Sequence, residues 1–81
     1  MPYIKTTRRT DILNGEHPKN AGELNYIITF QINLYLADKG ESYQTYNDIL
    51  GVLSAIPKEL YDRKIRPYED LKIKENGDVY D

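Results

Sequence analysis

Apolar side chains recur at helical spacing over most of the chain, and two long stretches carry the clearest pattern. The first stretch opens at Asn20, a good helix N-cap with Glu23 three residues later, and it closes at Lys39 before Gly40. At 100° per residue, its large apolar side chains cover an arc of roughly 200°. These side chains are Leu24, Ile27, Ile28, Phe30, Ile32, Leu34 and Tyr35. An arc this wide predicts a helix at 20–39 that is surrounded, either within the fold or by further copies of the chain.

The second stretch begins at Ser42, a good N-cap, and its apolar positions alternate in steps of three and four. They are Tyr46, Ile49, Leu50, Leu53, Ile56 and Leu60. This phase continues past Pro57, which has no N–H to donate, so we expect one helix with a kink at Pro57 rather than two helices. The residue before Pro67 is disfavoured in the helical region, and the helix is therefore predicted over 42–66.

The two ends of the chain carry weaker signals. A short N-terminal helix is expected from Thr6, as N-cap, to Gly15, as the stop. After Pro67 we expect a short helical turn followed by an extended tail. A small hairpin is the alternative, because Asn76-Gly77 is a strong turn signal between residues that alternate. The sequence thus predicts a mainly α-helical chain forming a single domain over residues 1–81.

The amino-acid composition limits which kinds of functional site the chain can form. The 81 residues include no cysteine and one histidine, which leaves no disulfides and no Cys/His zinc site within one chain. No apolar run approaches a membrane span and the N-terminus lacks a signal-peptide pattern, so we expect a cytoplasmic protein. Phosphate-loop, dinucleotide and metalloprotease motifs are absent, and His17 has no nucleophile near it in the sequence. We therefore expect no enzyme activity, no metal and no cofactor.

Binding is the chemistry that the residue types favour. Arg63 and Arg66 are three apart and are predicted to share a helix face suited to phosphates, with Tyr68 placed to stack on a base. Asn25 and Tyr26 are candidates for contacts to a base or ribose. The acidic pair Glu69 and Asp70 completes the candidate set. The cluster suits a small phosphorylated ligand and is too small for duplex nucleic acid; the alternative is a solvated face whose cations pair with neighbouring acids.

Several motifs along the chain point to one family. They are Gly22-Glu23-Leu24-Asn25-Tyr26, Lys39-Gly40, Ser42-Tyr43, Pro67-Tyr68-Glu69-Asp70 and Glu75-Asn76-Gly77-Asp78-Val79-Tyr80, together with the opening Met1-Pro2-Tyr3-Ile4-Lys5. In these motifs the chain resembles a family of small uncharacterised proteins encoded by bacteriophages and prophages. The resemblance spans nearly the whole chain and implies a setting in the cytoplasm of a phage-infected bacterium.

Three functional hypotheses follow. The leading one is a non-catalytic, homo-oligomeric phage accessory protein that binds a host-derived component, most concretely a sponge that sequesters a nucleotide-type immune signal. The second is a protein–protein interaction module that inhibits a host enzyme or acts with another phage protein. The third, a small nucleotide hydrolase with a site formed between subunits, has the least support, because no nucleophile–base pair accompanies the carboxylates Glu69 and Asp70.

Overall fold

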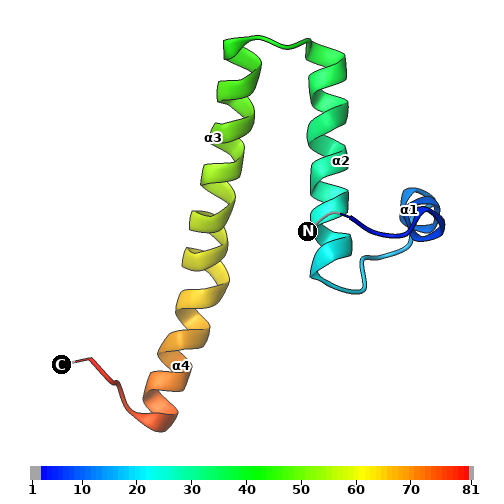
Figure 1. Cartoon of the computed structure of the whole chain (residues 1–81). Coiled ribbons are helices and arrows are strands. Elements are labelled where there is room, and N and C mark those ends of the chain that lie inside the picture. The colour runs from blue at the N-terminus through cyan, green and yellow to red at the C-terminus, as the bar shows by residue number, and fades with distance from the viewer. Residues whose placement is uncertain (1–2, 81) are drawn as a thin grey trace. The chain divides into compact units, whose positions relative to one another are not determined.

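Helices make up most of the chain in the computed structural model, which describes residues 3–80 (Figure 1). In chain order they are α1 (Thr6–Leu13), α2 (Ala21–Lys39), α3 (Tyr43–Leu60), a π-helical segment (Tyr61–Ile65) and α4 (Arg66–Asn76). No β-strand occurs among the described residues. The expected mainly α class is confirmed, with a short N-terminal helix and two long helical stretches.

The chain divides into two compact units, residues 1–45 and 46–81. The first unit holds α1, α2 and the first residues of α3, whereas the second holds the rest of α3, the π-helical segment and α4. Within residues 3–80, no helix is long and apolar enough to cross a membrane.

Helix α1 ends where the sequence indicated, at Gly15. Gly15 has a φ of +102° and its N–H donates to the carbonyl of Ile12 at 3.0 Å. The N–H of Glu16 then donates to the carbonyl of Asp11 at 3.1 Å, which completes the hydrogen-bond pattern of a Schellman motif. Helix α1 thus stops sharply, and the chain turns back toward the start of α2.

The caps predicted for the two long helices are confirmed. The side chain of Asn20 accepts a hydrogen bond from the N–H of Glu23 at 2.9 Å, and that of Ser42 accepts one from the N–H of Thr45 at 3.1 Å. Gly40, with a φ of +82°, ends α2, and its N–H donates to the carbonyl of Leu36. Local capping chemistry alone therefore sets these boundaries.

In the second unit, the long helix does not end near Arg66, as the sequence predicted, but continues beyond it. Arg66 has helical dihedral angles (φ −58°, ψ −49°), and the chain stays helical through Pro67 to Asn76. The N–H of Arg66 donates to the carbonyl of Tyr61, five residues back, so the turn before Pro67 is a wider π turn. Such a turn gives the proline ring room beside the preceding backbone, which an α turn lacks.

The predicted extended tail, and the hairpin that was its alternative, are both wrong for the residues up to Asn76. Residues 66–76 are helical, and Asn76-Gly77 ends α4 instead of turning a hairpin. Gly77 has a φ of +85° and its N–H donates to the carbonyl of Ile73 at 2.7 Å, which matches the ending of α2 at Gly40. Beyond it, the N–H of Tyr80 donates to the side chain of Asp78 at 2.9 Å, so only Gly77–Tyr80 lies outside helices at this end.

Candidate functional site

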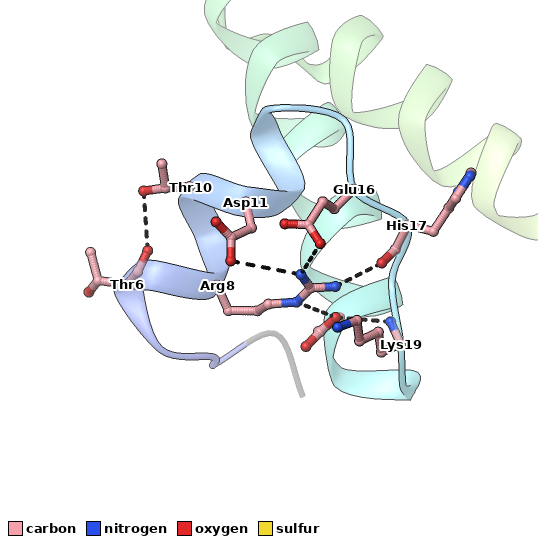
Figure 2. Close-up of polar contacts among 8 residues, drawn as sticks. Thr6, Arg8, Thr10, Asp11, Glu16, His17 and Lys19 are labelled. Carbon is pink, nitrogen blue, oxygen red and sulfur yellow. Dashed lines mark hydrogen bonds and ion pairs between the residues drawn. The ribbon is translucent and has the colours of Figure 1, made fainter.

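The densest polar cluster joins α1 to the first turn of α2 and is centred on Arg8. The Nε of Arg8 donates to Oε1 of Glu23 at 2.8 Å, and its Nη2 donates to the carbonyl of His17 at 2.8 Å. Its Nη1 lies 3.2 Å from Oε1 of Glu16 and 3.9 Å from Oδ2 of Asp11. Figure 2 shows the guanidinium enclosed by these groups from α1 and from the loop that follows it. All three nitrogens of Arg8 are therefore engaged within the chain.

Glu23 is the buried acidic partner in this cluster. Its Oε1 accepts hydrogen bonds from the backbone N–H of Lys19 at 2.9 Å and from Arg8. The Lys19 N–H, and after it the Arg8 guanidinium, hold the pKa of the Glu23 carboxyl below its ordinary value, against the opposing effect of burial. The hydrogen bond to Glu23 likewise raises the pKa of Arg8. The cluster keeps both partners charged and ties α1 to α2, so we interpret it as structural.

The two candidate residues on α2 already have neighbours in the first unit. The guanidinium of Arg9 lies over the ring of Tyr26, 5.7 Å from its centroid, and the ring of Phe30 stacks at 6.1 Å from Tyr26. The side chain of Asn25 accepts a hydrogen bond from Thr29 at 3.0 Å and stays exposed. Tyr26 is thus half-buried by its own unit, whereas Asn25 presents its amide to solvent.

The other five candidates lie in the second unit, where a guanidinium covers a tyrosine ring. Arg66 lies 5.7 Å from the centroid of the Tyr61 ring. The hydroxyl of Tyr61 in turn donates to Oε2 of Glu69 at 3.3 Å. Tyr61, Arg66 and Glu69 therefore share one side of the helical stretch, and the acid fixes the ring against which the cation rests.

A second cation–ring pair follows one turn later. The ammonium of Lys72 lies 5.5 Å from the centroid of the Tyr68 ring, and it also pairs with Glu75 at 3.4 Å. Arg63 points elsewhere: its Nε lies 3.7 Å from Oε2 of Glu59. Arg63 and Arg66 thus have different partners, although they were expected to act on one ligand together. Asp70 is exposed on the same helix.

We call Tyr61, Arg66, Tyr68, Glu69 and Lys72 the cation–ring surface. Every member is exposed, and of the two rings that of Tyr68 is the more open, at 61% against 37% for Tyr61. Flat rings with cations beside them offer stacking to an aromatic ligand and charge to an anion. Among the described residues, no group of three or more His, Asp or Glu side chains is placed to hold a metal ion.

Sequence reasoning missed two members of this surface as site residues, and it missed the Arg8 cluster. Tyr68 and Lys72 are four apart, the spacing at which helical side chains meet, so that pair had a signal in the sequence. Tyr61 and Arg66 are five apart and meet only because the π turn intervenes. Arg8 had no signal, since its partners Glu16, His17 and Glu23 are brought to it by the loop.

Comparison with known proteins gives a family and no function. No curated protein and no solved structure matches the chain. One family model matches residues 1–79, and its description is a domain of unknown function, DUF6899. This agrees with the expected membership of an uncharacterised family. Since the match covers nearly the whole sequence, the chain belongs to the DUF6899 family.

Proposed function

We propose that this chain is a non-catalytic, homo-oligomeric protein that binds a small host-derived ligand of nucleotide type. The observation that carries the proposal is the cation–ring surface of the second unit, where Arg66 lies over Tyr61 and Lys72 over Tyr68. A nucleotide combines an aromatic base with phosphates. It therefore matches a surface that alternates stacking rings with cations.

The open ring of Tyr68 is the expected platform for the base, because base–aromatic stacking tolerates any base. Arg66 and Arg63 are the expected phosphate contacts, because both guanidinium groups are exposed. Arg66 rests on the ring of Tyr61, and Arg63 forms an exposed ion pair with Glu59. Asn25 keeps an exposed amide for a base or ribose on α2. Glu69 holds the Tyr61 hydroxyl, and its expected role is to orient that ring.

The biological setting of the proposal rests on the resemblance to phage and prophage proteins. In an infected bacterium, a protein that binds a signalling nucleotide without turning it over removes the signal from the host. We therefore propose an anti-defence role, as a sponge for a nucleotide-type immune signal in the host cytoplasm. The expected behaviour is tight stoichiometric binding with the ligand released intact.

A second candidate is a protein-interaction module acting on a host enzyme or another phage protein. The observation that favours it is the number of open aromatic and apolar side chains outside the cation–ring surface, since aromatic side chains often anchor protein interfaces. Tyr43 is 90% exposed and Tyr80 is 85% exposed. In this role, the segment from Gly77 onward is the expected contact.

Titration calorimetry of the full chain against a panel of cyclic and linear nucleotides tests the proposal. We expect at least one nucleotide to bind, with Tyr68→Ala and Arg66→Ala each weakening it about tenfold or more. Lys58→Ala is the matched control, because Lys58 is an exposed cation paired with Asp62, outside the surface. The ligand recovered after incubation should be unchanged. No binding by any nucleotide, or its hydrolysis, would contradict the proposal.

A further inference from the structure

Two asparagines in the chain precede a glycine, Asn14-Gly15 where α1 ends and Asn76-Gly77 where α4 ends. A side-chain amide reacts most readily with the backbone that follows it when the next residue is glycine, because glycine has no Cβ to obstruct the approach. The other asparagines all precede a residue with a side chain; they are Asn20, Asn25, Asn33 and Asn47. The two Asn-Gly pairs are therefore the candidate sites of deamidation.

Deamidation of an Asn-Gly pair needs water and no other reagent. The backbone nitrogen of the glycine loses its proton and attacks Cγ of the asparagine, which closes a cyclic succinimide. The Cγ–Nδ2 bond breaks, and the amide nitrogen leaves as ammonia with that proton. Water then opens the ring at either carbonyl and leaves an aspartate or an isoaspartate. Nothing is oxidised or reduced.

The fold controls this reaction through the backbone of each pair. Ring closure requires rotation about the Cα–C bond of the asparagine, out of the helical range. It also requires the glycine N–H to leave its hydrogen-bond acceptor. Both asparagines are exposed, so access to water does not distinguish them. The hydrogen bonds that must open at each helix end do distinguish them.

The Asn14-Gly15 pair is held by several contacts within the first unit. The N–H groups of Gly15 and Glu16 both donate to carbonyls of α1, at 3.0 and 3.1 Å. The carboxylate of Glu16 also lies 3.2 Å from Nη1 of Arg8. Rotation at Asn14 therefore breaks two backbone hydrogen bonds and draws Glu16 away from Arg8.

The Asn76-Gly77 pair is held by a single backbone hydrogen bond, from the N–H of Gly77 to the carbonyl of Ile73 at 2.7 Å. Among the described residues, no other backbone hydrogen bond joins α4 to the residues that follow it. The N–H of Tyr80 donates to the side chain of Asp78, which lies beyond the helix as well. A helix end held this weakly opens at low free energy. The reactive backbone conformation is therefore reached more often at Asn76 than at Asn14.

We infer that Asn76 is a site of spontaneous deamidation in the folded protein and that Asn14 is protected by the end of α1. The product adds a carboxylate beside Glu75 at the C-terminal end of α4, where the helix dipole disfavours negative charge. An isoaspartate also lengthens the backbone and separates the Gly77 N–H from the carbonyl of Ile73. Either product loosens the last turn of α4. The inference holds whether or not a nucleotide binds.

Peptide mapping of the folded chain, incubated for days at pH 8, tests the inference. Trypsin cuts after Arg9, Lys19 and Lys74, so the peptides 10–19 and 75–81 each hold one of the two asparagines and no other. Mass spectrometry then gives the deamidated fraction of each peptide. We expect Asn76 to react at least about tenfold faster than Asn14, because fewer contacts must open. Equal rates, or no reaction at Asn76, would overturn the inference.

The same incubation in guanidinium chloride separates the fold from the local sequence. In the denatured chain, the two pairs should react at similar rates, with Asn14 accelerated far more than Asn76. A denatured chain that keeps the tenfold preference would overturn the protective role assigned to the end of α1.

Two matched variants assign the released ammonia. Glutamine has one more methylene and closes its larger ring much more slowly. Asn76→Gln should therefore remove most of the ammonia that the folded chain releases, whereas Asn14→Gln should leave the release unchanged. The opposite result would overturn the assignment to Asn76.

Discussion

Arg8 and Glu23 form a direct ion pair across the junction of α1 and α2, with the Nε of Arg8 2.8 Å from Oε1 of Glu23. Both side chains are largely shielded from solvent, at 16% and 9% exposure. Glu23 is also the residue whose N–H is capped by Asn20. The Glu23 carboxylate thus connects the first turn of α2 to α1. The ion pair with Arg8 holds these two helices together in the first unit.

Replacing Arg8 by Met should loosen α1 from α2 while keeping most of the side-chain volume. Glu23 then loses its cationic partner, and a buried carboxylate without a partner is costly. We expect a lower melting temperature and faster amide hydrogen exchange in residues 6–13. Lys19→Met is the matched control, because Glu23 binds the backbone N–H of Lys19 and not its ammonium. Equal losses from both changes would contradict this role of Arg8.

The same pair predicts a pH dependence. The folded-state pKa of Glu23 is lower than its ordinary value of 4.5, first because of the Lys19 N–H and then because of Arg8. The group therefore contributes stability above pH 4.5 that is lost as the pH falls through the folded-state pKa. Arg8 remains protonated throughout, and Asp11 and Glu16 are the other acids that face it.

Urea unfolding of the native chain and of Glu23→Gln from pH 7 to pH 3 measures this contribution. The native chain should lose stability more steeply below pH 4.5, and the variant should lack that part of the slope. Parallel curves for the two proteins would show that Glu23 does not carry the dependence.

The N-cap of α2 gives a second stability prediction. Asn20→Ala removes the acceptor of the Glu23 N–H and should cost about 1 kcal/mol in the free energy of unfolding. Asn20→Asp keeps an acceptor and should cost little. Chemical denaturation of the two variants provides the comparison, and similar losses would argue against a capping role.

Two glycines should respond to alanine with opposite signs. Gly40 has a φ of +82°, so Gly40→Ala forces a strained backbone and should destabilise the chain by about 1 kcal/mol. Gly51 lies inside α3 with nothing within 4 Å of an added Cβ, so Gly51→Ala should stabilise the helix by about 0.5–1 kcal/mol. Melting temperatures of both variants check the contrast. A stabilising Gly40→Ala would refute the assigned conformation.

Local chemistry made much of the fold predictable. The helix ends predicted from capping residues are found where expected, because a cap depends only on neighbours within a few residues. These capping residues are Asn20 and Ser42 at the helix starts, and Gly15 and Gly40 at the helix ends. The end of the long helix was not predictable from the same rules. Arg66 stays helical before Pro67 because the π turn widens the backbone there, which overrides the usual preference of a residue before proline.

The π turn between Tyr61 and Arg66 was not foreseen from the sequence. Without that turn, two residues five apart do not share a helix face, and Tyr61 does not meet Arg66. The same omission explains why Arg63 and Arg66 were expected to act together, since three-residue spacing gives a shared face only in a regular α-helix. Asn76-Gly77 was ambiguous because glycine with positive φ ends a helix as readily as it forms a hairpin turn.

Native mass spectrometry of the full chain, with and without a panel of cyclic and linear nucleotides, tests the central claim most directly. The account predicts a homo-oligomer in both samples, with a fixed number of intact nucleotides bound in the second. A monomer that carries no nucleotide at any concentration would contradict it.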